Sequence, residues 1–428
     1  MSSHRVASLA LGAALVACAG CKGGSTCRTG EATDVRATSD ARVVGVGVLG
    51  HHEIRVGDLP HPGGETATNG PTVIARPAGA NLVMPEGFTI APFAEGIFKG
   101  PRWVTVAPDG DVFVADAGAG SIIVLRDIDG DGRSDAHFTF ATGQNRPFGL
   151  AFHESWLYVG NTDRVVRFRY RPGQTAAEGE PELITELPSG GYNAHWTRNV
   201  AFNLEHTKLY ATVGSETNAD EEPEPRASVL EMNPDGSGRR VFAYGTRNPI
   251  GLAFHPETHA LWAVVQERDG RGEDLVPDYA TELKDGGFYG WPFGYMGRHE
   301  DPAHRNMRPS LVRQTLDPDV LIQAHSATMS IAFYTGSMFP QEYVNDAFVA
   351  LHGSWNRQKR TGYKLVRIRM NHGRPIGGYD DFAIGFMLGQ DRCEVWGRPV
   401  GLAVAKDGSL LMVDDGNMLV WNIRYKSP

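Results

Sequence analysis

Short apolar runs that each follow a polar turn recur along the chain. The text "NRPFGLAF" at 145–152 returns in related form as "HWTRNVAF" at 195–202, "YGTRNPIGLAF" at 244–254 and "GRPVGLAV" at 397–404. Four or five apolar residues next to Gly or Pro are typical of a buried β-strand rather than of a helix. The repetition therefore predicts one type of strand that the fold uses several times.

Six copies of this strand emerge when each apolar run is aligned on one residue. The aligned residues are Val106, Ala151, Ala201, Ala253, Ala332 and Ala403. Most copies are followed by a turn and a second strand, as in "PDGDVFVAD" and "KDGSLLMVDD". Such units at a period near ~45 residues indicate a β-propeller.

The sequence thus predicts an all-β fold, a six-bladed β-propeller over 85–428, with insertions in the two longest gaps at 264–325 and 354–396. A β-sandwich is the structural alternative, but it does not require the same unit six times.

The N-terminus predicts export. His4 and Arg5 precede an apolar run that ends at Ala17, which is too short to span a bilayer and is typical of a signal peptide over 1–17. "LVAC" at 15–18 resembles a lipobox, whose Cys18 is lipidated after cleavage. The alternative is an ordinary secretory signal that is cut nearby.

The segment 18–84 is rich in Gly, Ala, Thr and Pro and predicts a lipid-anchored tether and an irregular arm. We therefore expect a lipoprotein at the periplasmic face of a bacterial membrane, which contacts the membrane only through its anchor.

Composition narrows the class of partner. The 428 residues are 41% hydrophobic and 21% charged, and the net charge of −9 disfavours nucleic-acid binding. Cys21 and Cys27 fall in the predicted tether and Cys393 stands alone, so the spacing predicts neither a zinc site nor a disulfide framework.

The alignment also places polar residues around the predicted channel. Six positions before the aligned residue stand Gly100, Asn145, His195, Arg247, Ser326 and Gly397. Five positions before it stand Pro101, Arg146, Trp196, Asn248, Ala327 and Arg398. Equivalent positions of inner strands converge near a propeller's axis. The sequence therefore predicts that one His, several Arg and two Asn crowd one mouth of the channel.

This set of residues favours a planar anionic ligand. Guanidinium groups bind carboxylates bidentately and stack on flat rings, and clustered arginines repel one another without an anion. His195 has the chemistry of a base that takes a proton from an alcohol. The alternative is a purely structural role, in which these arginines pair with carboxylates of neighbouring blades.

Two acidic segments raise the question of calcium. Positions 1, 3, 5 and 9 of the loop 127–135 are acidic, and the sixth is Gly, as in an EF-hand-like loop. The expected ligands are Asp127, Asp129, Asp131, the Arg133 carbonyl and Asp135. The segment 266–279, "QERDGRGEDLVPDY", could hold a second calcium near the channel or be a solvated loop.

From about residue 85 to 425 the chain resembles the pyrroloquinoline quinone (PQQ)-dependent sugar dehydrogenases, most closely the L-sorbosone dehydrogenase branch. The resemblance rests on "HWTRNVAF", "YGTRNPIGLAF", "QERDGRGEDLVPDY", "GGFYGWPFGYMG", "HGSWNR" and "WGRPVGLAV". It implies a six-bladed propeller with PQQ over the central channel, a sugar or sugar-aldehyde substrate, and an external electron acceptor such as a quinone, a cytochrome or a dye.

The resemblance also implies roles for individual residues. His195 corresponds to the catalytic base, and Arg247 and Asn248 to the pair that contacts the quinone oxygens. Arg398 corresponds to an arginine on a cofactor carboxylate, and Asn356 or Arg357 to a cofactor-binding lysine. Backbone carbonyls near Glu267 and Arg268 correspond to the site of the Ca²⁺ that bridges PQQ to the protein.

Two rival functions follow from the same pattern. A calcium-dependent propeller lactonase or hydrolase would need Glu, Asn and Asp side chains around an axial metal, and the aligned positions supply His and Arg instead. A non-catalytic sugar-binding propeller would not need the base His195.

Overall fold

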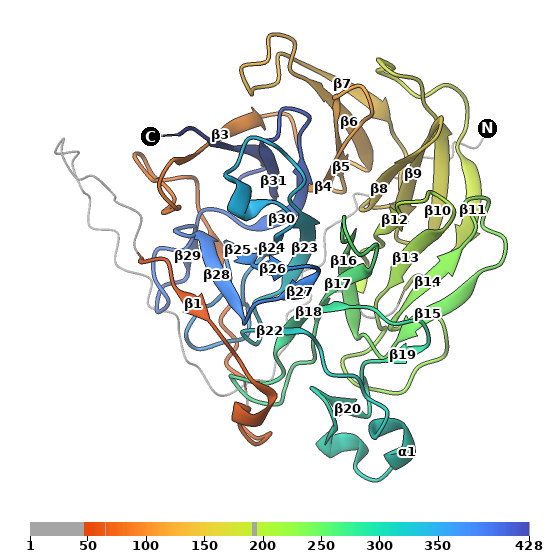
Figure 1. Cartoon of the computed structure of the whole chain (residues 1–428), viewed down its shortest axis with the longest axis vertical. Coiled ribbons are helices and arrows are strands. Elements are labelled where there is room, and N and C mark those ends of the chain that lie inside the picture. The colour runs from red at the N-terminus through yellow and green to blue at the C-terminus, as the bar shows by residue number, and fades with distance from the viewer. Residues whose placement is uncertain (1–46, 65, 191–194, 428) are drawn as a thin grey trace, which may run out of the picture.

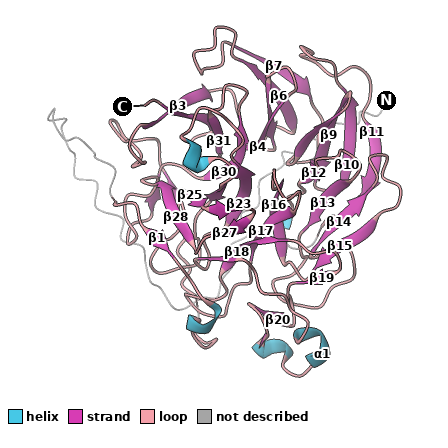
Figure 2. Ribbon diagram, in the orientation of Figure 1, coloured by secondary structure: helices cyan, strands magenta, loops and turns pink. Residues whose placement is uncertain are grey.

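The computed structural model describes residues 47–64, 66–190 and 195–427 of the chain. Six β-sheets are arranged around a common axis, and the few helical turns lie in loops (Figures 1 and 2). Within these ranges, no helix is both long and apolar enough to span a bilayer. The predicted signal peptide and Cys18 fall outside the described residues.

Each sheet is one antiparallel blade. From the axis outward, blade 1 consists of β4 (Pro101–Val106), β5 (Val112–Asp116), β6 (Ser121–Arg126) and β7 (Ala136–Ala141). Blade 2 consists of β8 (Leu150–His153), β9 (Trp156–Asn161), β10 (Arg164–Arg169) and β11 (Glu182–Glu186). Blade 3 consists of β12 (Val200–Phe202), β13 (Leu209–Val213), β14 (Ser228–Met232), β15 (Arg240–Tyr244) and the short parallel β19 (Gly287–Phe288).

The remaining blades continue the same order. Blade 4 consists of β16 (Asn248–Phe254), β17 (Leu261–Gln266), β18 (Asp278–Glu282) and β22 (Val320–Ile322). Blade 5 consists of β23 (Thr328–Phe333), β24 (Ala347–Leu351), β25 (Lys364–Ile368), β28 (Tyr379–Ala383) and β1 (His51–His52). Blade 6 consists of β30 (Pro399–Val404), β31 (Leu410–Asp414), β32 (Leu419–Tyr425) and β3 (Phe88–Glu95).

Blade 6 closes the ring. Its outer strand β3 comes from the start of the propeller and pairs antiparallel with the C-terminal strand β32, from Phe88 opposite Tyr425 to Glu95 opposite Leu419. The two ends of the propeller are thereby joined by backbone hydrogen bonds. The sequence prediction of six blades is confirmed, and all six aligned residues lie in the six innermost strands.

Shorter strands and helical turns lie in the connections between the strands of the blades. Two-residue strands form the pairs β2 (Thr72–Val73) with β29 (Glu394–Val395), β20 (Gly294–Tyr295) with β21 (His299–Glu300), and β26 (Met370–Asn371) with β27 (Arg374–Pro375). The helical segments are α1 (Pro309–Val312) and the 3₁₀ turns Val56–Asp58, Pro302–His304 and Gln341–Tyr343.

The two predicted insertions include too many residues. The range 264–325 includes β18 and β22 of blade 4, and the range 354–396 includes β25 and β28 of blade 5. The sequence between two successive inner strands always includes the outer strands of a blade. The length of that sequence therefore overstates the length of the insertion. The irregular parts lie between β18 and β22 and around the turns at 353–363 and 384–398.

The glycine of the repeated motif lets inner strands approach one another at the axis. A Cβ at Gly149 would lie 2.5 Å from the backbone N of Val200, and one at Gly251 would lie 2.8 Å from the backbone of Ile331. Both neighbours belong to the inner strand of the next blade. Since real Cβ atoms do not approach so closely, the motif keeps Gly for packing reasons.

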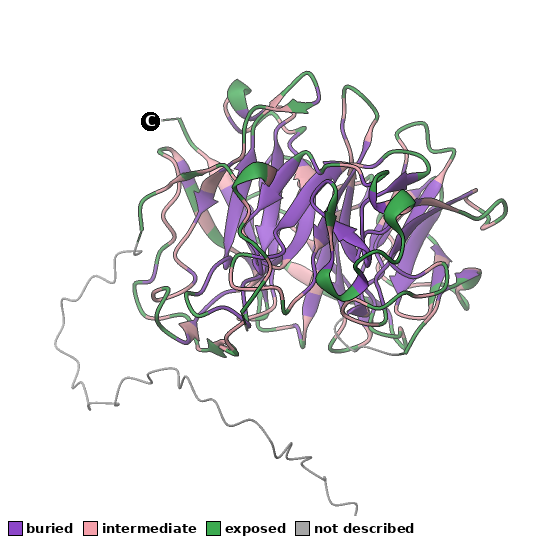
Figure 3. Cartoon of the chain, turned by 90° about the horizontal axis from the view of Figure 1, so that it is seen from below, coloured by how far each residue is buried: buried purple, intermediate pink, exposed green. Residues whose placement is uncertain are grey.

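The core lies between successive blades. Trp262 and Val264 of blade 4 pack with Ile331 and Val349 of blade 5, and equivalent buried clusters lie between other blades. Each such aliphatic side chain contributes roughly 1.5–3 kcal/mol on full burial. Seen from the side, the middle of the disc is buried, while the loops at its two faces are exposed (Figure 3).

Cys393 corrects the interpretation of the cysteines. It is buried and takes part in a disulfide bond. The other three cysteines lie outside the described residues. The sequence did not predict this bond, because the spacing of cysteines does not reveal which of them meet in space.

Candidate active site

The inner strands are irregular where they begin, at one mouth of the channel. The ladder between β16 and β17 shifts between Pro249 and Leu252, and similar shifts occur near the starts of β4, β23 and β30. Bulges of this kind redirect side chains and are frequent at functional sites. The residues that line the mouth therefore depart from regular alternation.

A polar hollow of about 410 Å³, counting space that is open to solvent, lies at this mouth. It is lined by His195, Arg247, Gln266, Glu267, Asp269, Asp278, His325, Ala327, Trp355 and Asn356. His195 and Arg247 were predicted from the alignment to lie near each other, and both line this hollow. Most of the other lining residues come from the segments 266–278 and 353–361.

His195 is held in one tautomer. Its side chain is buried, and its Nδ1 lies 2.9 Å from Ser215 Oγ and 3.0 Å from the Ser215 carbonyl oxygen. Ser215 Oγ donates its own proton to the Thr217 carbonyl at 2.6 Å, so Nδ1 is the donor toward Ser215. The lone pair of the neutral ring is then on Nε2.

The charge state of His195 follows from its surroundings. Burial, and then the nearby positive charge of Arg247, lower the pKa of His195 to about 3. The imidazole is thus neutral at physiological pH. A neutral imidazole with a defined lone pair is the form that can accept a proton.

Arg247 is fixed by the chain itself. Its Nη1 donates to the Glu267 carbonyl at 2.7 Å, its Nε and Nη2 donate to Asn218, and Nη2 lies 3.3 Å from an Asp269 oxygen. The side chain is almost fully buried. Because backbone and side-chain acceptors hold the guanidinium on several sides, it is a preorganised positive group beside His195.

Asn248 follows Arg247 in the chain, is buried, and is the first residue of β16. Its Nδ2 donates to Gln266 Oε1 at 3.1 Å, whereas its buried Oδ1 has no hydrogen-bond partner among the described residues. A Cβ at Gly214 would meet both Asn248 Oδ1 and His195 Cβ, so the two side chains flank the same point. A buried polar atom without a partner indicates that a ligand or water contacts it.

The lining of the hollow also includes the carboxylates of Asp269 and Asp278. Asn356 Nδ2 donates to Asp269 Oδ1 at 2.7 Å and lies 3.2 Å from His325 Nδ1. Burial opposes ionisation of Asp269, but hydrogen bonding to His325 and the charge of Arg247 hold its pKa below the ordinary value. Asp278 is fully buried, and burial raises its pKa to about 7.

A second group of cations faces the channel from blades 1, 2 and 6. The Arg146 guanidinium lies 4.1 Å from the Trp196 ring centre, and that of Arg102 lies 5.3 Å from it. Arg398 Nη2 is 3.0 Å from His352 Nδ1. We call Arg102, Arg146 and Arg398 the arginine group.

Among the described residues, the ion pairs of the arginine group are with Asp415. Arg102 forms an ion pair with Asp415, and Arg398 Nε lies 3.9 Å from the same side chain. Despite its burial, His352 and Arg102 hold the pKa of Asp415 well below its usual range. Burial, and then the charge of Arg398, lower the pKa of His352 to about 4, so it adds no charge at neutral pH. The group therefore carries an excess of positive charge that favours a multivalent anion.

Two predicted cofactor residues are directed elsewhere. Arg357 donates to the Glu273 carbonyl and, at 2.5 Å, to Asp274 Oδ1. The Asn145 carbonyl accepts from the Thr162 backbone N–H at 3.0 Å, within blade 2. Neither lines the hollow, and among the other predicted cofactor residues Arg146, Asn248 and Arg398 do not line it either. Asn356, the other candidate of the pair 356–357, does line it.

Of the two backbone carbonyls predicted to bind a cofactor calcium, that of Glu267 does not fit the ion as it stands. The Glu267 carbonyl accepts from the Arg247 guanidinium, whose positive charge opposes a cation at the same oxygen. The Arg268 side chain is fully buried and bonds to Glu267 and Asp301. The local role of both side chains in this structure is to brace the segment 266–278.

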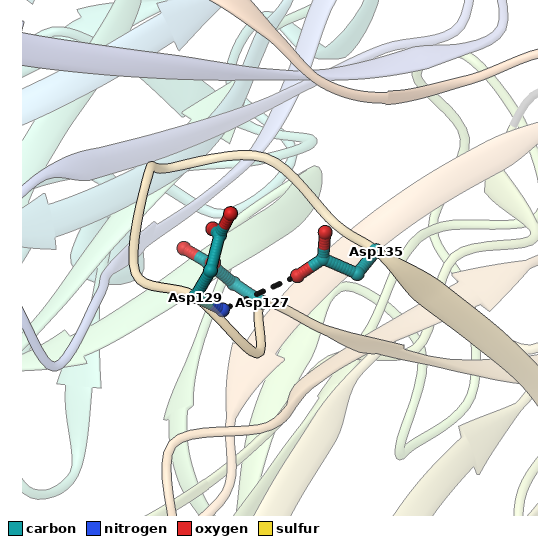
Figure 4. A group of neighbouring side chains, drawn as sticks. All are labelled: Asp127, Asp129 and Asp135. Atoms are coloured by element: carbon teal, nitrogen blue, oxygen red, sulfur yellow. Dashed lines mark hydrogen bonds between the residues drawn. The ribbon is translucent and has the colours of Figure 1, made fainter.

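The acidic loop on blade 1 brings three of its predicted ligands together. One oxygen each from Asp127, Asp129 and Asp135 lies within 4.8 Å of the others (Figure 4). Asp131 is not part of this group, and its Oδ1 accepts from the Arg133 backbone N–H at 2.8 Å. Backbone N–H groups of Gly130 and Gly132 donate to Asp127 and shape the loop.

Several site residues were not predicted from the sequence. Ser215, Asp269, His325 and Trp355 lie outside the aligned turns, and Asp415 was read only as the end of a strand. Arg102 is adjacent to the aligned position Pro101, so extending the register by one residue would have found it.

Fold and site together define a six-bladed propeller with a polar, arginine-lined site at one mouth of its central channel. The sequence profile described as Glucose / Sorbosone dehydrogenase matches residues 143–372. The chain belongs to the glucose/sorbosone dehydrogenase family.

Individual relatives agree with this assignment. An uncharacterized protein of Borreliella burgdorferi is 26% identical over 83% of this chain and 94% of its own length. The PQQ-dependent pyranose dehydrogenase of Coprinopsis cinerea is 23% identical over 77% of this chain, which spans 52% of that protein. The holo form of its PQQ domain has a TM-score of 0.68 at 20% identity, covering 81% of this chain and 97% of that domain, and thus shares the fold. Homologues of this chain therefore include PQQ-dependent sugar dehydrogenases, which are oxidoreductases.

Proposed function

We propose that the protein is a PQQ-dependent dehydrogenase that oxidises an aldose, a sugar aldehyde such as sorbosone, or a related sugar alcohol. The observation that carries this proposal is the neutral, tautomerically fixed His195 beside Arg247 at the mouth of the channel. That pair supplies a base and a fixed positive charge at one point, which the oxidation of an alcohol requires.

The residues at the mouth fit the cofactor chemically. PQQ is a planar tricarboxylate, and the arginine group offers excess positive charge with only Asp415 to balance it. Buried Nε atoms of Arg102 and Arg398 and the Oδ1 of Asn248 have no hydrogen-bond partner among the described residues. Arg398 would hold a carboxylate, while Arg247 and Asn248 would orient the quinone edge.

The cofactor and the protein would divide the reaction between them. When bound, PQQ would accept the hydride from the substrate carbon. His195 would hold the substrate hydroxyl and take its proton at Nε2, so that the C–O bond becomes a carbonyl as the hydride leaves. Arg247 would counter the negative charge that develops nearby. Electrons would pass on to an external quinone, cytochrome or dye.

The acidic loop 127–135 and the N-terminal segment with Cys18 add a metal site and a cellular location to this proposal. A structural Ca²⁺ would be held by the loop 127–135, and no catalytic step is assigned to a metal near Glu267. The signal peptide and Cys18 would anchor the enzyme at the periplasmic face of a membrane. Incorporation of labelled palmitate that is lost in Cys18→Ala tests the anchor.

A dye-reduction assay tests the function. Purified protein is mixed with PQQ, with and without Ca²⁺, and a panel of aldoses, sorbosone and sugar lactones is added. Dye reduction that needs both PQQ and a sugar supports the proposal. Lactone hydrolysis without PQQ would support the hydrolase instead, and sugar binding without any turnover would support the non-catalytic propeller.

A further inference from the structure

The segment that precedes the propeller lies against the loops of the site. We call residues 47–84 the N-terminal arm. Its strand β1 extends blade 5 by pairing with β28, and β2 pairs with β29. Between these two attachments, residues 61–64 and 66–70 have no regular secondary structure. This middle part of the arm passes both segments that line the hollow.

One of these segments is the rim loop, residues 353–361. It contains no strand or helix and carries Trp355 and Asn356, which both line the hollow. The Trp355 side chain is 48% exposed, although its neighbour Asn356 is buried. A half-exposed aromatic ring at the mouth of a polar hollow provides a flat apolar surface for a ligand. The position of that ring depends on what holds the rim loop.

Asn69 of the arm holds the rim loop at several points. Its backbone N–H donates to the Trp355 carbonyl at 2.8 Å. Its Nδ2 donates to the carbonyls of Arg357 at 2.9 Å and Gln358 at 3.1 Å. Its Oδ1 accepts from Arg360 Nη2 at 2.9 Å. One side chain thus bonds to both limbs of the turn that presents Trp355.

The arm also links the rim loop to the opposite segment of the hollow. Glu273 accepts from the backbone N–H of Ala67 at 3.0 Å and from that of Gln358 at 2.7 Å. Gly63 donates to the Arg271 carbonyl at 3.1 Å. The arm, the rim loop and the segment 266–278 therefore form one hydrogen-bonded unit around the mouth.

We propose that the N-terminal arm is a positioning element of the substrate pocket, and that Asn69 fixes the rim loop so that Trp355 faces the sugar. The statement that Trp355 faces a sugar rests on the proposed function. Loss of the Asn69 side chain leaves the backbone bond to Trp355 but removes three contacts of the turn. The loop is then less ordered, and sugar affinity falls because ordering it opposes binding.

Three variants separate this role from a general loss of stability. Asn69→Ala removes all side-chain contacts. Asn69→Asp keeps an acceptor for Arg360 but sets a carboxylate against two carbonyls. His51→Ala is the matched control, because His51 belongs to the same arm and bonds to Asp380 at 2.7 Å on blade 5 without touching the rim loop.

Hydrogen–deuterium exchange of the protein without cofactor gives the first readout. We expect amides of 353–361 to exchange about tenfold faster in both Asn69 variants and at the wild-type rate in His51→Ala. Unchanged exchange in Asn69→Ala, or wild-type exchange in Asn69→Asp, overturns the positioning role. This readout does not depend on any enzymatic activity.

Steady-state kinetics with PQQ gives the second readout. We expect the KM for the sugar to rise about tenfold in both Asn69 variants, with kcat within about twofold and PQQ affinity unchanged. An unchanged KM together with faster exchange overturns the role in sugar binding. A wild-type protein that reduces no dye overturns the proposed function and that role with it, while the exchange result still decides whether the arm fixes the loop.

Discussion

The two sides of the channel mouth use arginine in different ways. On the side of blade 4, Arg247 is surrounded by acceptors of the chain itself: the Glu267 carbonyl, Asn218 and Asp269. On the side of blades 1, 2 and 6, the arginine group has Asp415 as its carboxylate partner, and the buried Nε atoms of Arg102 and Arg398 have no hydrogen-bond partner among the described residues. The Arg247 guanidinium is held by acceptors of the protein on several sides, whereas the arginine group carries excess positive charge.

This difference separates two tasks. A satisfied, buried guanidinium has a fixed position, so Arg247 can lower the pKa of His195 beyond the effect of burial and face a developing charge without reorganising. A cluster with excess charge gains most from an anion, so the arginine group is suited to bind the cofactor carboxylates. The comparison predicts that the two sides respond differently to substitution.

The largest effect is expected at His195. His195→Ala removes the proposed base, and we expect kcat to fall by about 10³-fold or more, since general-base catalysis is worth roughly 10²–10⁴-fold. PQQ affinity should change by less than about threefold, because the carboxylates would be held by the arginine group. Dye reduction and equilibrium titration measure the two quantities. Retention of wild-type kcat would show that another group is the base.

The next effect contrasts stability on the two sides. Arg247→Gln leaves buried acceptors and Asp269 without their cation, and we expect the free energy of unfolding to fall by about 3–5 kcal/mol. Arg398→Gln relieves repulsion within the arginine group and should cost less than about 1 kcal/mol. Urea unfolding of the proteins without cofactor measures both. Equal losses at the two positions would remove the distinction drawn here.

The pH dependence tests the surroundings of His195. With its pKa at about 3, His195 stays neutral, so kcat/KM should show no acid limb near pH 6.5 that belongs to this residue. Arg247→Gln removes a like charge, so any acid limb from His195 should move to higher pH. A pH–rate profile of both proteins is the measurement. A wild-type limb near 6.5 that vanishes in a His195 variant would contradict the assignment.

Thermal stability should follow the same histidines. The folded pKa values of His195 and His352, about 3 and about 4, lie below the unfolded value of about 6.5. Between these limits the unfolded chain binds more protons, so stability should fall as pH falls from about 6.5 toward 3. Melting curves at several pH values measure this loss. A melting temperature that rises in this range would count against neutral, buried histidines.

The smallest effect concerns the acidic loop. If Asp127, Asp129 and Asp135 hold a structural Ca²⁺, millimolar Ca²⁺ should raise the melting temperature by a few degrees, about 2–4 °C, because the ion binds only the folded loop. The double variant Asp127→Asn, Asp129→Asn should lose this shift and retain turnover. A calcium-dependent shift that persists in the variant would place the ion elsewhere.

The sequence predicted the scaffold in detail. The six apolar runs are the six inner strands, because a repeated unit must bury the same positions in each copy. For the same reason, the register brought His195 and Arg247 to one hollow, and placed Arg146 and Arg398 at the same mouth. These residues precede inner strands whose spacing around an axis is fixed by the fold.

The rest of the site depends on segments that the repeat does not describe. Asp269, His325 and Trp355 come from irregular connections, whose path is set by contacts distant in sequence. Arg357 illustrates the limit: it follows a residue of the hollow, but Asp274 and the Glu273 carbonyl bind its guanidinium. The register likewise did not show that Asn145 bonds within its own blade.

The most direct test of the account is a titration of PQQ into the protein without cofactor, followed by absorbance, for the wild type and for Arg398→Gln. The account predicts one site per chain in the wild type and an affinity lower by about 10–100-fold in the variant, the value of one charge-assisted contact of about 1.5–3 kcal/mol. No binding to the wild type, or equal affinity in both proteins, would contradict the claim that the excess positive charge at the channel mouth binds the cofactor.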